Sequence, residues 1–167
     1  RTDEERSTVD GASLVNADHD QVIEIWNLVF MEYNRKADSS LVPLPSKHVD
    51  TGMGLERLVR AVHAQQSNYD SDLFMDTIRT LEKMSEKTYG KDTQVDIAFR
   101  VVADHLRAVC FAVADGQLPD NSGAGYVIRR ILRRAVRYGY SFLDVKQPFM
   151  YLLVDGLILK FGHVFEN

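Results

Sequence analysis

The sequence has little of what marks several large classes of protein. A single cysteine, Cys110, excludes a disulfide framework and suits a reducing compartment such as the cytoplasm. No apolar run approaches the roughly 18 residues that a membrane-spanning helix needs. The net charge is −4, so no overall basicity points to nucleic acid. The hydrophobic content of 45% is that of a globular chain, and 167 residues suffice for one average domain or two small ones.

Charge is nevertheless distributed unevenly along the chain. Residues 121–143 contain five arginines and no Asp, Glu or Lys, so this window carries +5 and the remainder of the chain carries −9. The arginines are Arg129, Arg130, Arg133, Arg134 and Arg137. Like charges at this helical spacing repel each other, so the segment requires anions from outside itself. Nucleic-acid phosphates and acidic residues elsewhere in the chain both meet this requirement, and we favour the phosphates.

The first third of the chain has the composition of strands. β-branched and aromatic residues predict a strand over 22–33 that is apolar on both faces, and therefore central in a sheet and covered on both sides. A turn at 34–40 leads to a short strand near 41–44, which Pro43 and Pro45 confine to an edge or a brief segment. The next strand, over 47–54, pairs antiparallel with the first.

Helical spacing takes over after these strands. The expected helices lie at 55–63, about 73–84, 94–114, 123–138 and 147–160. The predicted fold class is therefore α+β, with short antiparallel strands followed by an all-α domain. We place the domains at 1–66 and 67–167.

The junction between the last strand and the first helix has the residues best suited to binding a ligand. Asp50, Gly52 and Gly54 point to one face of an extended strand, which makes a small pocket with a carboxylate at one end, suited to an ammonium group. Arg57 lies in the first turn of the following helix, where a guanidinium can clamp a phosphate. The alternative is a plain strand-to-helix turn whose glycines serve packing. It is not a P-loop, because no G-K-[ST] follows.

Two other polar positions admit a functional and a structural interpretation. Asn27 lies mid-strand among apolar neighbours, so it either faces the same pocket as Asp50 or is satisfied by backbone at a sheet edge. His105 follows Asp104 on a nearly all-apolar helix that also carries Cys110. None of these has the spacing of a metal site, so we expect a core histidine and no bound metal.

Four long segments resemble the alanyl-tRNA synthetase family, which belongs to class II of the aminoacyl-tRNA synthetases. They are "EIWNLVFMEYNR" at 24–35, "PLPSKHVDTGMGLERLV" at 43–59, "SNYDSDLF" at 67–74 and "VVADHLRAVCFAVADGQLPDNSGAGYVIRRILRRAVRYG" at 101–139. The similarity covers about residues 20–160 in the family's own order. The stretch at 48–62 resembles motif 3, a strand followed by a helix with a Glu-Arg pair.

The resemblance implies roles for the residues of the junction. Asp50 would hold the α-ammonium group of alanine, while Asn27, Val29 and Gly52 would line the pocket around its methyl group. The residues implied for ATP are Gly52, Gly54 and Arg57. The implied reaction activates alanine with ATP and Mg²⁺ and transfers it to tRNA(Ala). Motifs 1 and 2 and the editing domain, where zinc would be expected, belong to the rest of the synthetase chain, so this chain alone is expected to be inactive.

The helical part would be the tRNA-recognition domain. In the family, an asparagine before the arginine-rich helix reads the G·U wobble pair of the acceptor stem, and it maps to Asn121. The five arginines would lie next to the RNA backbone. Family members often have a basic residue near the position of Ala124, so phosphate contacts there would be weaker. The alternatives are a non-catalytic helical RNA-binding module and a helical domain that docks on an acidic protein.

Overall fold

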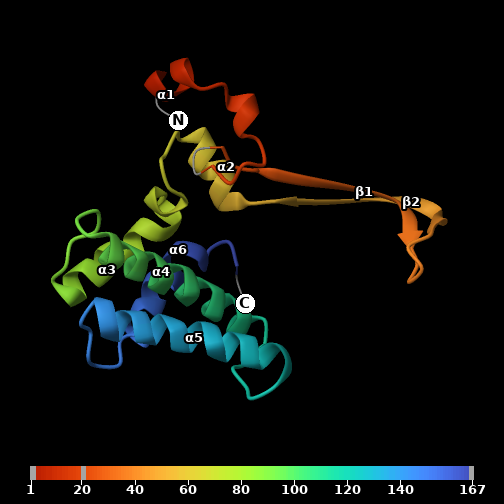
Figure 1. Cartoon of the computed structure of the whole chain (residues 1–167). Coiled ribbons are helices and arrows are strands. Elements are labelled where there is room, and N and C mark those ends of the chain that lie inside the picture. Colours follow the sequence, from red (N-terminus) through yellow and green to blue (C-terminus); the bar gives the residue numbers. More distant parts are fainter. Residues whose placement is uncertain (1–2, 20–21, 166–167) are drawn as a thin grey trace. The chain divides into compact units, whose positions relative to one another are not determined.

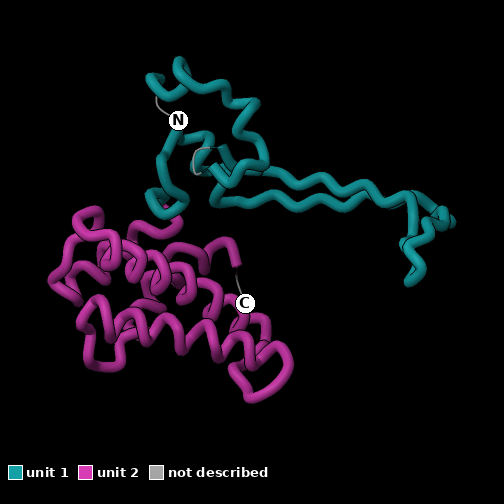
Figure 2. Tube along the Cα trace, in the orientation of Figure 1, with its two compact units in different colours: residues 1–71 teal, residues 72–167 magenta. Residues whose placement is uncertain are grey.

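The structure, a computed structural model, describes residues 3–19 and 22–165 (Figure 1). The chain forms two compact units, residues 1–71 and residues 72–167 (Figure 2). The predicted fold class is confirmed, because an antiparallel pair of strands precedes a series of helices. The assignment of a catalytic domain to 1–66 and a tRNA-recognition domain to 67–167 stays a prediction.

The first unit is built around a long β-hairpin. Strands β1 (Trp26–Arg35) and β2 (Leu41–Met53) pair antiparallel, and the hairpin extends away from the rest of its unit (Figure 2). The other elements of this unit are α1 (Asp3–Thr8), η1 (Gly11–Leu14), α2 (Leu55–Val62) and η2 (Asn68–Asp70). Asn68 to Asp70 are held by a capping box, in which Ser67 and Asp70 satisfy each other's backbone N–H groups.

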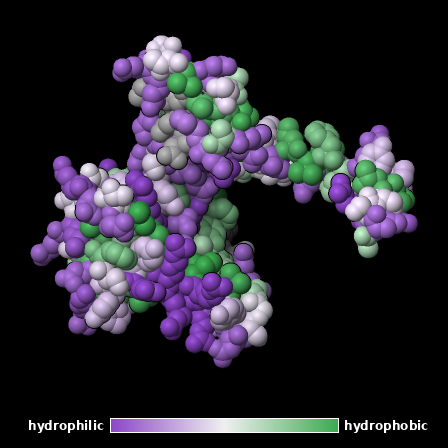
Figure 3. Space-filling model, viewed as in Figure 1, coloured by the Kyte–Doolittle hydropathy of each residue, from purple (hydrophilic) through white to green (hydrophobic). Residues whose placement is uncertain are grey.

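One expectation about the strands was wrong, and one was met only in part. Every residue of β1 is exposed, so within this chain the strand is neither central nor covered, and Figure 3 shows apolar side chains along the hairpin surface. Pro43 and Pro45 lie inside one continuous strand, so β2 is not a brief segment, although it is an edge strand, which was the other expected possibility. Each strand of a two-stranded hairpin has a free side, where a residue without an N–H breaks no ladder bond. A register shift between Met31 and Tyr33 takes up the extra residues of β2.

The second unit contains the apolar core. Its helices are α3 (Asp72–Ser85), α4 (Thr93–Ala114), α5 (Gly123–Phe142) and α6 (Val154–Phe161), with the 3₁₀ turn η3 (Met150–Leu153) before α6. Among the described residues, all fully buried apolar side chains lie between positions 74 and 157, the largest being Phe99, Ile78, Leu81 and Leu106. Asp92 caps α4 by accepting hydrogen bonds from the backbone N–H groups of Gln94 and Val95, each at 2.9 Å.

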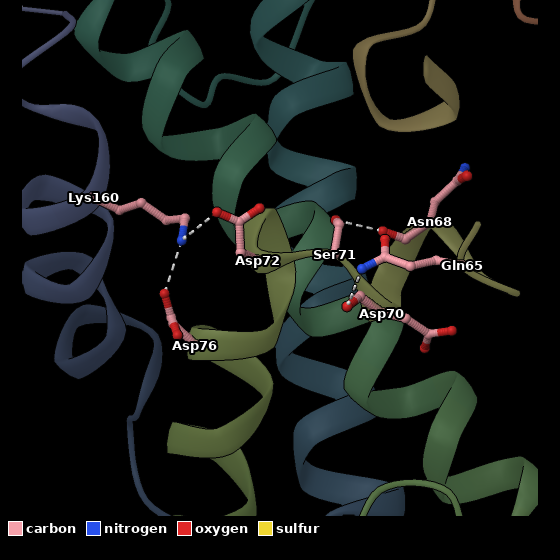
Figure 4. A network of polar contacts seen from close by, with 7 residues as sticks. All are labelled: Gln65, Asn68, Asp70, Ser71, Asp72, Asp76 and Lys160. Carbon is pink, nitrogen blue, oxygen red and sulfur yellow. Dashed lines mark hydrogen bonds and ion pairs between the residues drawn. The ribbon is translucent and has the colours of Figure 1, made fainter. Parts of the chain in front are cut away.

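An ion-pair cluster ties the last helix to α3 (Figure 4). Lys160 Nζ lies 2.9 Å from Asp76 Oδ2 and 3.5 Å from Asp72 Oδ2. Burial by itself lowers the pKa of Lys160, but the hydrogen bonds and charges of Asp76 and Asp72 outweigh it, so the pKa is raised. The two carboxylates are largely exposed, which limits the stabilisation that this cluster provides.

Candidate functional site

The register of the hairpin brings four of the predicted residues to one face. Asn27 lies opposite Gly52, and Val29 lies opposite Asp50. Directly opposed residues of an antiparallel pair share a face, and so do residues two apart in one strand. One face therefore carries two adjacent cross-strand pairs, Asn27 with Gly52 and Val29 with Asp50. The opposite face is apolar except for Thr51 and is formed by Trp26, Leu28, Phe30, Val49, Thr51 and Met53.

This face presents a carboxylate beside open space. Asp50 is exposed, and within the described residues no hydrogen bond or ion pair reaches its carboxylate. A Cβ added at Gly52 would meet no heavy atom within 4 Å. Asn27 is exposed and shares this face with Asp50, and its Nδ2 donates a hydrogen bond to a side chain, Glu24 Oε2, at 3.2 Å. The arrangement can receive a small cationic group next to an uncrowded backbone.

Arg57 lies in the first turn of α2, directly after the strand that carries Asp50. Its Nη1 donates to the main-chain oxygen of Glu24 at 2.9 Å and lies 3.9 Å from Glu24 Oε1. Gly54 makes room for this conformation, since a Cβ there would lie 3.2 Å from Arg57 Cδ. The backbone N–H of Gly54 also donates to the oxygen of Ile25 at 3.1 Å, which holds the start of the helix against the segment before β1.

Glu24 is a site residue that sequence reasoning missed. It lies two residues before β1 and contacts both Asn27 and Arg57. The available signal was an acidic residue near the start of the predicted strand 22–33, whose two faces are largely apolar. The sequence alone does not indicate which residue Glu24 contacts, because Arg57 is 33 positions away.

The α5 surface has a second set of predicted residues. All five arginines are exposed, and within residues 3–19 and 22–165 none of them forms an ion pair with an acidic side chain. Arg130 lies over the ring of Tyr126 and Arg134 over that of Tyr138, at 5.8 and 5.5 Å from the ring centroids. A surface hollow of about 1290 Å³ is lined by Arg130, Arg133, Arg134 and Arg137, together with His105 and with aliphatic and aromatic side chains.

Asn121 is connected to this arginine surface. It lies in the loop before α5, and its Oδ1 accepts a hydrogen bond from Arg129 Nη1. A carbonyl oxygen has two lone pairs, so this contact leaves one acceptor position and the NH₂ group of Asn121 available. In the described part of the chain, no acidic side chain pairs with the α5 arginines. Of the two anion sources considered above, this favours one outside the chain.

A family model for class II tRNA synthetases (A) matches residues 2–167. The chain belongs to this family. It is 61% identical over 167 residues to the alanine–tRNA ligase of Parabacteroides distasonis and 60% identical to that of Porphyromonas gingivalis. Each alignment covers all of this chain and 19% of the relative, so the chain spans about a fifth of the length of these proteins. The predicted resemblance to alanyl-tRNA synthetases is confirmed.

Other features of this synthetase chain bear on metals and membranes. His105 Nδ1 lies 3.1 Å from Asp104 Oδ2, and the described residues contain no group of three His, Cys, Asp or Glu side chains that could hold a metal ion. Cys110 is half-buried, and burial raises the pKa of its thiol. Among the helices that the structure describes, none is both long and apolar enough to cross a membrane.

Proposed function

We propose that the chain is part of an alanine–tRNA ligase and contributes to two of its tasks. The hairpin and the start of α2 form part of the alanine and ATP site, and α5 with Asn121 contacts the acceptor stem of tRNA(Ala). The observation that carries this proposal is the shared face of Asn27, Val29, Asp50 and Gly52, with family membership and the relatives' names as support.

The chemistry assigns a task to each residue of that face. The Asp50 carboxylate binds the α-ammonium group of alanine through a charge-assisted contact. The open backbone at Gly52, with Asn27 and Val29, leaves room for a methyl group and excludes larger side chains by steric overlap. Such a pocket cannot strongly reject glycine or serine, because one methyl or hydroxyl group changes binding by only a few kcal/mol.

Arg57 would bind the phosphates of ATP. In the activation step, a carboxylate oxygen of alanine attacks the α-phosphorus, and the bond from that phosphorus to the oxygen bridging to the β-phosphate breaks. Pyrophosphate leaves, and the alanyl group then passes to a ribose hydroxyl at the 3′ end of the tRNA as AMP departs. A guanidinium fixed beside the reacting phosphates stabilises their charge. Mg²⁺ accompanies ATP, and we assign it no ligand in the described residues of this chain.

Replacing Asp50 with asparagine in the intact enzyme tests the ligase site. Asp50→Asn keeps the size of the side chain but removes the charge that holds the ammonium group, so we expect alanine-dependent ATP–pyrophosphate exchange to be lost. The matched control is Glu32→Gln, on the same hairpin, where the carboxylate pairs with Lys47. Unchanged exchange in Asp50→Asn would refute the ligase site proposed on the hairpin, and the contribution of this chain would then be reduced to RNA binding by its helical part. The 167-residue chain alone should show no exchange.

Binding to two acceptor-stem hairpins tests the RNA contact. One hairpin has a G·U pair and the other has G·C, and affinity is measured across a salt series. We expect tighter binding to G·U that is lost in Asn121→Ala. Arg133→Ala should instead weaken both complexes equally and make the logarithmic salt slope shallower by about 1. Salt-independent binding would contradict phosphate contacts by the α5 arginines.

A further inference from the structure

Glu24 makes three contacts that connect separate parts of the proposed site. Its Oε2 accepts from Asn27 Nδ2 at 3.2 Å, and its Oε1 lies 3.9 Å from Arg57 Nη1. Its main-chain oxygen accepts from that same Nη1 at 2.9 Å. Asn27 belongs to the alanine side of the proposed site and Arg57 to the ATP side. One residue therefore contacts both sides without belonging to either.

The contact with Asn27 selects one orientation of a side chain that can otherwise turn over. An asparagine side chain has an acceptor end and a donor end, and which end faces a ligand depends on its other partners. An ionised carboxylate only accepts hydrogen bonds, so it attracts the NH₂ end of Asn27. The Oδ1 end is then left toward the rest of the face, where it can accept a hydrogen bond.

The contact with Arg57 fixes a guanidinium without using all of its donors. Arginine has five N–H donors in a planar fork, and Glu24 engages only Nη1. The other nitrogens can still bind an anion. Both side chains of the pair are about half exposed, so the contact orders Arg57 more than it stabilises the fold.

We propose that Glu24 is a positioning residue of the ligase site, which orients Asn27 toward alanine and Arg57 toward ATP. This inference rests on the proposed function. Glu24 acts through its two neighbours and needs no contact with either substrate. The carboxylate serves both neighbours, whereas the main-chain oxygen serves Arg57 alone.

The test compares Glu24→Ala with Glu24→Gln in the intact enzyme, using ATP–pyrophosphate exchange to measure KM for alanine and KM for ATP separately. Glu24→Ala should raise KM for alanine by about 3- to 10-fold, because the hydrogen bond to Asn27 is lost. It should raise KM for ATP by about 2- to 5-fold, because the exposed ion pair with Arg57 is lost while the main-chain hydrogen bond remains. Glu24→Gln should restore KM for alanine, because its amide oxygen still accepts from Asn27. It should leave KM for ATP raised, because the charge opposite Arg57 is gone. Glu32→Ala is the matched control and should change neither value.

Two results would overturn the proposal. One is KM values within twofold of wild type in Glu24→Ala, and the other is the same shift in Glu24→Gln as in Glu24→Ala. An NMR measurement tests the contact between Glu24 and Asn27 independently of whether the proposed ligase site is correct. In the 167-residue chain, Glu24→Ala should move the side-chain NH₂ resonances of Asn27, while Glu32→Ala should not. If Asp50→Asn retains exchange, the ligase site is refuted, and unmoved Asn27 resonances would then refute the positioning contact as well.

Discussion

The variant Gly52→Ala tests whether Gly52 is needed to leave space for the substrate or is needed for the fold. No heavy atom of the chain lies within 4 Å of the added Cβ, and the backbone at Gly52 does not adopt a positive φ. Alanine also loses less conformational freedom in a strand than glycine, by roughly 0.5–1 kcal/mol. We therefore expect the fold of the variant to be as stable as wild type, or slightly more stable.

Activity should respond in the opposite direction. If the substrate methyl group lies above Gly52, the added Cβ competes for the same space, and overfilling a close-packed site costs about 1–3 kcal/mol. That cost corresponds to a roughly 5- to 150-fold loss in kcat/KM for alanine. Glycine has no methyl group, so its activation should fall less and the preference for alanine over glycine should shrink.

The assay is ATP–pyrophosphate exchange by the intact enzyme with alanine and with glycine, alongside thermal unfolding of each variant. The control is Thr51→Ala, since Thr51 lies on the opposite face of the hairpin, across from Leu28. Wild-type kcat/KM for alanine in Gly52→Ala would refute the reasoning, because the space above Gly52 would then not be substrate space. An equal loss for alanine and glycine would refute the placement of the methyl group.

Two further predictions concern the helical unit. Gly139→Ala would place a Cβ against the ring of the buried Phe149, so urea unfolding should show that the free energy of unfolding falls by about 1–3 kcal/mol. The control is Gly156→Ala in α6, where the added Cβ meets nothing within 4 Å, so this variant should be as stable as wild type or more stable. A Gly139→Ala variant as stable as wild type would contradict the packing of Phe149 on α5. Lys160→Met should cost up to about 1 kcal/mol. Because the folded-state pKa of Lys160 is raised, its contribution is complete below the ordinary value of 10.5 and is lost as pH rises through the folded value. The difference between wild type and variant in urea unfolding should therefore disappear at strongly alkaline pH, and a difference that grows there would have the wrong sign.

The helices and the shared face of the hairpin follow from periodicity in the sequence. Period-two alternation correctly put Asp50 and Gly52 on one face, and spacing of 3.6 residues located α3, α4 and α5 closely. The exposed arginines of α5 were equally readable, because α5 has an apolar stripe that they avoid. Local patterns are sufficient when the partners are near in the sequence.

Features that depend on distant partners could not be predicted. The apolar faces of β1 indicated burial, but burial needs covering layers, and the described residues of this chain provide none over the hairpin. The continuity of β2 through Pro43 depends on the strand having a free edge, which is a property of the sheet and not of the segment. Glu24 was missed because its contact with Arg57 arises only when the start of α2 returns to the segment before β1.

The fully buried apolar side chains of the described chain all lie between positions 74 and 157. We therefore expect two levels of protection against amide hydrogen exchange, one in the helical unit and a lower one in the hairpin. Amide hydrogens of α4 should exchange with solvent only when the helical unit opens as a whole, whereas those of the hairpin need only a local opening that exposes little new apolar surface. A single unfolding temperature measured by helical circular dichroism would therefore describe α3 to α6 and say little about the strands. The residues proposed to bind alanine and ATP thus lie on a part of the chain with a small opening free energy, where a bound substrate would slow amide exchange by the factor 1 + [L]/Kd, with [L] the concentration of free substrate.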